Sequence, residues 1–158
     1  MRNRINRMIT YRIPEQASIS KADFHRLATR ICEGTEQAKE LFKLFLKTGS
    51  EVDCVICNND TMALGVVEAC KEAGIDLNSV PVVGVDATAD GCQSIQNGDM
   101  AFTVYQSGSG QGSKAVEMAM ELMNGQDGQN LEGITEDGLY VWVPFEGVDS
   151  NNVANYIK

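Results

Sequence analysis

Polar side chains follow three predicted strands of this 158-residue chain. Asn58, Asn59 and Asp60 come after the apolar run 52–57, Asp86 comes after 80–85, and Gln106 comes after 101–105. An amide group both donates and accepts hydrogen bonds, whereas an ionised carboxylate is a strong acceptor. This mixture suits an uncharged, polyhydroxylated ligand, and it contains no activated nucleophile.

Part of this cluster has an alternative, structural explanation. Asp60, or Thr61 beside it, stands at the start of a predicted helix and is expected to cap its N-terminus. Three other residues, Asn59, Asp86 and Gln106, do not all fit capping roles, so we predict that they bind the ligand.

The segments that position these side chains alternate between strand-like and helix-like patterns. Predicted strands cover 52–57, 80–85, 101–105 and 139–143, and predicted helices cover 20–31, 35–47, 61–73, 86–98, 110–124 and 150–157. The predicted fold class is therefore α/β, with a mostly parallel sheet and flanking helices. In such sheets ligands bind at the carboxyl ends of the strands, where the polar residues lie.

Apolar residues at helical spacing predict the buried helix faces. They are Ala38, Leu41, Phe42, Phe45 and Leu46 in 35–47; Ala63, Val66, Val67 and Cys70 in 61–73; and Val116, Ala119, Met120 and Met123 in 110–124. Each face is expected to pack on the core.

The net charge of −9 argues against a nucleic-acid partner, because phosphate binding relies on lysine and arginine. No apolar run has the length of a membrane span. All six arginines lie before residue 31, so we divide the chain into an atypical head, 1–34, and a main domain, 35–158. The head is either a basic surface arm or a segment of different origin from the main domain.

The residues offer little for catalysis, and we predict no enzyme activity and no cofactor. Cys54 and Cys57 lack a second ligand pair and are expected to be core residues. The single histidine, His25, lies beside an apolar stripe in the head. The glycines of "GSGQG" are followed by Ser113 where a dinucleotide fingerprint requires glycine.

The segments "VICNNDTMALGVVEACKEAG", "VPVVGVDATADG", "GDMAFTVYQSGSGQG" and "VPFEGVD" resemble the galactose/glucose-binding proteins of bacterial sugar ABC transporters, in the type I periplasmic-binding-protein superfamily. The resemblance implies a non-enzymatic receptor that binds galactose or glucose outside the cytoplasm and presents it to a membrane permease. By position, Asn59 and Asp86 correspond to residues that bind sugar hydroxyls, and Gln106 replaces an asparagine.

The chain departs from this family in several respects. It matches only the C-terminal portion, so one lobe plus a crossover remnant is expected, with sugar binding weak or lost. Glu33 stands where a stacking tryptophan would be, and Asp53 alone matches the calcium site, so no metal is predicted. Residues 1–16 lack the apolar stretch of an export signal. Helix 110–124 and strand 139–143 would belong to the other lobe, so their apolar faces could promote self-association.

A lac-repressor-type transcription regulator is the alternative, since its effector-binding domain shares the fold. Those regulators usually read close to G-F-D-D after the second strand, whereas this chain reads "GVDATADG". Its first two predicted helices lack a basic recognition face beyond Arg26 and Arg30. The sequence thus favours a sugar receptor over a regulator.

Overall fold

The computed structural model describes residues 34–157. Their elements are α2 (Thr35–Leu46), β1 (Val55–Ile56), α3 (Asp60–Ala73), β2 (Val82–Val83), α4 (Ala89–Gln96), β3 (Thr103–Gln106), α5 (Gly108–Met123), β4 (Phe145–Val148) and the 3₁₀ helix η2 (Val153–Asn155). Residues 1–33 of the predicted head, with helix 20–31, His25 and Glu33, lie outside the described residues. The boundary at 34/35 therefore stays a prediction.

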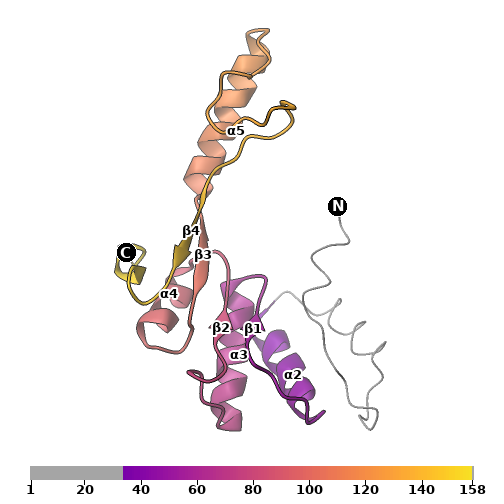
Figure 1. Ribbon diagram of the computed structural model, residues 1–158, viewed down its shortest axis with the longest axis vertical. Helices are drawn as coiled ribbons and strands as arrows, with labels where there is room; N and C mark the ends of the chain where they lie inside the picture. Colours follow the sequence, from indigo (N-terminus) through magenta and orange to yellow (C-terminus); the bar gives the residue numbers. More distant parts are fainter. Residues whose placement is uncertain (1–33, 158) are drawn as a thin grey trace.

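The strands form the α/β arrangement that the sequence predicted (Figure 1). β1 pairs in parallel with β2, and a parallel bridge between Val83 and Phe102 continues the pairing toward β3. β4 then runs antiparallel to β3, with Thr103 opposite Val148 and Gln106 opposite Phe145. The first three strands therefore place their carboxyl ends at one edge.

The last predicted strand, 139–143, is wrong. The antiparallel strand β4 lies further along the chain, and within 139–143 only Val141 pairs, through a bridge to Ile134. Gly133, directly before Ile134, has φ 88°, and a Cβ there would collide with the Trp142 backbone carbonyl. The apolar alternation of "LYVWV" therefore supports a local turn pairing rather than a sheet strand.

Helix α3 begins and ends as its sequence indicates, but with a different cap. Asn59 Oδ1 accepts a hydrogen bond of 2.9 Å from the backbone N–H of Met62, so Asn59 is the N-cap and the expected capping by Asp60 or Thr61 is wrong. Gly74 ends the helix with φ 69°, a left-handed conformation that glycine adopts without a Cβ penalty. The predicted face of Ala63, Val66, Val67 and Cys70 is buried.

Helix α2 packs closely on α3. Ala38, Phe42 and Phe45 are buried, as predicted, and the two phenylalanine rings stack with their centroids 5.9 Å apart. A Cβ at Gly65 would collide with the backbone carbonyl of Thr35. The absence of a side chain at Gly65 therefore permits the close approach of the two helices.

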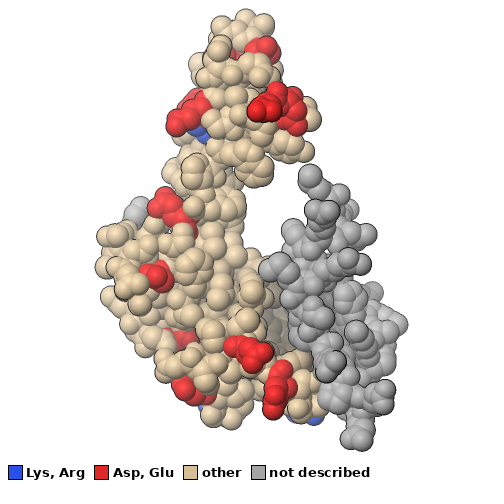
Figure 2. Space-filling view, in the orientation of Figure 1, with Lys and Arg blue, Asp and Glu red and all other residues tan. Residues whose placement is uncertain are grey.

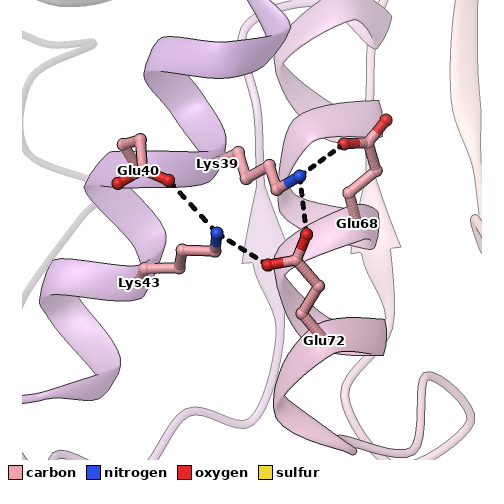
Figure 3. Close-up of polar contacts among 5 residues, drawn as sticks. All are labelled: Lys39, Glu40, Lys43, Glu68 and Glu72. Atoms are coloured by element: carbon pink, nitrogen blue, oxygen red, sulfur yellow. Dashed lines mark hydrogen bonds and ion pairs between the residues drawn. The ribbon is translucent and has the colours of Figure 1, made fainter.

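A charged network runs along the outer side of this helix pair (Figure 3). Lys39 Nζ lies 3.0 Å from Glu68 Oε2 and 2.7 Å from Glu72 Oε1, and Lys43 joins Glu72 to Glu40. Hydrogen bonds to Glu72 and then Glu68 raise the pKa of Lys39. The network links the two helices at their surface, where ion pairs contribute little individually.

The core lies between the sheet and α2, α3 and α4. It includes Val82, Ile95, Met100, Val148 and Val153, together with the buried faces of α2 and α3. Cys57, Cys70 and Cys92 are buried apolar residues, and burial raises the pKa of the Cys70 thiol. Cys54 is exposed, so its prediction as a core residue is wrong, because the strand has its buried face at Cys57 instead.

Residues 108–144, here called the arm, project away from this core (Figure 1). No described residue of α5 is buried, and Val116, Met120 and Met123 are 60%, 59% and 86% exposed. The expectation that this face packs on the core is therefore wrong. Acidic side chains are also visible on the surface of the arm (Figure 2).

Candidate sugar-binding edge

Two of the predicted ligand-binding residues meet at the sheet edge. Gln106 Nε2 donates a hydrogen bond of 3.1 Å to Asp86 Oδ1. Gln106 is the last residue of β3, and Asp86 follows β2 and aligns with β3 through its backbone N–H, which donates to Val104 O at 2.8 Å. An amide and a carboxylate thus lie side by side and offer both donors and acceptors to a ligand.

Asp86 sits in an unusual backbone conformation. Its φ is 109° and that of Ala87 is 50°, which residues with a Cβ rarely adopt. Its carboxyl pKa is raised, first by partial loss of solvent and second by the charge of Asp60, while the hydrogen bond from Gln106 lowers it. Strain of this kind concentrates at functional sites, where the surrounding structure maintains it.

Asn59 comes from the neighbouring strand end and is half-buried. Its carbonyl oxygen is engaged as the N-cap of α3, but its amide nitrogen has no hydrogen-bond partner among residues 34–157. No hydrogen bond in the described part of the chain joins Asn59 to Asp86 or Gln106. Asn59 can therefore donate to a ligand while capping the helix.

Asp60 has a role that the sequence did not reveal. It is fully buried, and it accepts hydrogen bonds from Thr88 and from Thr103. Capping was the expected function because an aspartate at a helix start is a common signal. Thr103 lies 43 positions after Asp60 in the sequence. Their contact therefore leaves no local pattern that the sequence could show.

A groove of about 420 Å³ lies between the arm and the start of β4, where Phe145 pairs with Gln106. Its lining is mainly apolar and includes Met118, Leu139, Tyr140, Trp142 and Phe145. The Trp142 ring stacks on Tyr140, with centroids 6.2 Å apart, and is 65% exposed. The Trp142 ring therefore makes its stacking contact within the arm.

Within the described range 34–157, histidine, cysteine and acidic side chains form no group of three suited to an ion. Asp53, which the resemblance aligned with a calcium ligand, is exposed. The expected absence of a cofactor stays a prediction.

Comparison with known families assigns the fold. Residues 18–127 match the family described as "Periplasmic binding protein domain". The chain belongs to this family. That placement agrees with the α/β arrangement seen here, and it makes the observed sheet edge part of a periplasmic-binding-protein fold.

Curated relatives of the family have names that refer to several solutes. A Rhizobium meliloti protein named for rhizopine binding is 32% identical over 90% of this chain and 47% of its own length. The D-galactose/methyl-galactoside binding periplasmic protein of Haemophilus influenzae is 32% identical over 69% of this chain and 32% of its length. The chain thus spans less than half of each relative.

A solved structure of a solute binding protein is also similar to this chain. The ABC transporter solute binding protein of Bacillus halodurans, with bound myo-inositol, superposes with a TM-score of 0.63 and 32% identity, over 78% of this chain and 39% of that one. These relatives are solute-binding proteins. In the described part of this chain, no helix combines the length and apolarity needed to cross a bilayer.

Proposed function

We propose that Asn59, Asp86 and Gln106 form one wall of a binding site for a monosaccharide or a related polyol, in the solute-binding component of an ABC transporter. The observation that carries this proposal is the 3.1 Å contact between Gln106 and Asp86 at the carboxyl edge of the sheet. Sugar hydroxyls both donate and accept, so they match an amide and a carboxylate presented together.

Galactose and glucose are the sugars that the sequence resemblance favours. The names of the relatives widen the class, since they include proteins for ribose and xylitol and a structure with bound D-allose. We therefore propose the class of ligand, with galactose and glucose as the first members to test. The relatives' names support a receptor over a transcription regulator.

The proposal includes a permease as the partner and a location outside the cytoplasm, both by analogy with the relatives. It includes no enzymatic step, because the edge carries no nucleophile and base in contact. The described residues form a single wall, whereas a small-molecule site usually encloses most of its ligand. We therefore propose weak binding, with a dissociation constant on the order of 1 mM, or about −4 kcal/mol.

Thermal unfolding of the full chain tests this function. A ligand that binds only the folded state at about one hundred times its dissociation constant adds roughly 2.7 kcal/mol of stability. We expect galactose or glucose, or else ribose or myo-inositol, to raise the melting temperature more than sucrose does at the same concentration. Sucrose is the control because its exclusion from the protein surface stabilises any folded protein without specific binding. Equal shifts for every sugar and for sucrose would contradict the proposal.

A further inference from the structure

The buried carboxylate of Asp60 connects three separate segments at the sheet edge. Its Oδ2 atom accepts hydrogen bonds from Thr88 N at 2.7 Å and from Thr88 Oγ1 at 3.1 Å. Its Oδ1 atom accepts a hydrogen bond of 2.5 Å from Thr103 Oγ1. Asp60 itself is anchored by its backbone N–H, which donates to Val85 O at 2.8 Å. Helix α3, the loop after β2 and strand β3 are therefore joined through one side chain.

The loop held in this way is the one that carries Asp86. Ala87 N donates to Thr103 Oγ1 at 3.3 Å, and Thr88 N donates to Asp60, so the two residues after Asp86 are both fixed. These bonds act where φ is positive, at Asp86 and Ala87. A conformation that costs energy needs such external support to persist.

The surroundings are built closely around this carboxylate. A Cβ at Gly84 or at Gly91 would collide with a carboxylate oxygen of Asp60. Thr88 also caps α4, since its Oγ1 accepts from Gly91 N at 3.1 Å. The N-termini of α3 and α4 thus both approach Asp60, and the positive ends of helix dipoles stabilise a negative charge. A capping role alone would require none of the contacts to Thr88 and Thr103.

We propose that Asp60 is a positioning residue for the binding wall: through Thr103 and Thr88 it holds Asp86 in the orientation that meets Gln106 and the ligand. The part of this proposal that concerns the ligand rests on the proposed function above. The part that concerns the loop does not, because it is a statement about the conformation of residues 86–88.

The test compares two variants that lose the same chemical group. Thr103→Val removes the hydroxyl that bonds Ala87 N and Asp60 Oδ1, while Thr103→Ser restores it. Thr48→Val removes the hydroxyl that donates to Phe45 O at 2.7 Å, at the end of α2, and serves as the control. For each full-length variant we would measure the unfolding free energy, the amide exchange of Thr88, the NMR signals of Asp86 and Ala87, and sugar affinity.

We expect Thr103→Val to shift the NMR signals of Asp86 and Ala87. It should also speed the amide exchange of Thr88 roughly tenfold and weaken sugar affinity roughly tenfold. A tenfold change is the size expected for the loss of one hydrogen bond to a charged group. Thr103→Ser should restore all three, and Thr48→Val should change none. Unchanged signals and exchange at residues 86–88 in Thr103→Val would overturn the proposal, whatever the loss of stability.

Failure of the proposed function gives a different result. If the wild type binds no sugar of the panel but Thr103→Val still releases the loop, the positioning role stands and the ligand assignment falls. If Thr103→Val does not fold, Asp60→Asn provides the same readouts, because its amide group cannot accept from both Thr88 and Thr103. Asp60→Asn with an unaltered 86–88 loop would equally overturn the proposal.

Discussion

Gln106 Nε2 and Asp86 Oδ1 lie 3.1 Å apart, and their hydrogen bond joins the ends of two neighbouring strands. The bond stabilises the charged form of Asp86, whereas loss of solvent and the nearby Asp60 charge disfavour it. The pKa of Asp86 therefore depends on both Gln106 and Asp60. This relationship gives the first prediction.

The pKa of Asp86 should respond in opposite directions to changes on its two sides. Gln106→Leu removes the hydrogen bond that lowers the pKa of Asp86, so this pKa should rise further. Asp60→Asn removes a nearby negative charge, so the pKa of Asp86 should fall toward the ordinary value of 3.8. Carbon-13 NMR titration of the Asp86 carboxyl measures both. Equal pKa values in all three proteins would contradict the described contacts.

The raised pKa also predicts a sign for stability. Because the folded pKa lies above the ordinary 3.8, the Asp86 contribution to stability is fully present below that value and is lost as pH rises through the folded pKa. Asp86→Asn should thus reduce the decline of unfolding free energy over this acidic interval, as measured by urea denaturation.

Backbone strain at Asp86 predicts that two truncations differ in stability. Asp86→Gly relieves the φ of 109°, whereas Asp86→Ala retains a Cβ in that conformation. We expect the free energy of unfolding of the glycine variant to be about 1 kcal/mol higher than that of the alanine variant, because glycine adopts positive φ without strain. Both should lose sugar binding. A more stable alanine variant would show that the loop does not hold this conformation.

Two glycine-to-alanine changes within helices should have opposite effects. A Cβ at Gly65 collides with the backbone of α2, so Gly65→Ala should lower the unfolding free energy by about 1–3 kcal/mol. Gly112 has open space around it in α5, so Gly112→Ala should be neutral or should stabilise by up to about 1 kcal/mol. Urea denaturation checks both, and a tolerated Gly65→Ala would argue against the α2–α3 packing.

Exposed residues of the arm should matter for association rather than for folding. Met120→Gln and Met123→Gln replace side chains that are 59% and 86% exposed, so each should change the unfolding free energy by less than about 0.5 kcal/mol. We expect the same changes to reduce concentration-dependent self-association in sedimentation experiments. A large loss of stability would mean that this face is covered in solution.

Local sequence patterns predicted the helices best where a buried stripe and an end signal coincide. In α3 the apolar face and Gly74 were both recognisable, and both are confirmed. In α5 an equally good stripe is exposed, because periodicity indicates an apolar face but not what covers it. The alternation in 139–143 failed for a related reason, since strand patterns do not identify a pairing partner.

The residues of the binding edge could be predicted because the ends of the strands could be predicted. Asp86 and Gln106 were predicted to lie at the same edge of the sheet, because each follows a predicted strand, and the structure brings them into contact. Asn59 was predicted as a binding residue, but its capping of α3 was missed because Asp60 is an equally good local cap signal. The buried contacts of Asp60 depend on Thr88 and Thr103, which only the folded chain brings together.

An NMR titration of the labelled full-length chain with galactose, glucose, ribose and myo-inositol tests the central claim most directly. Such a titration detects even millimolar affinity, about −4 kcal/mol. A one-walled sugar site predicts saturable shifts at the amide groups of Asn59, Asp86 and Gln106 for at least one of these ligands, with none in Asp86→Ala. Saturable shifts confined to the arm, or no saturable shift with any of them, would contradict it.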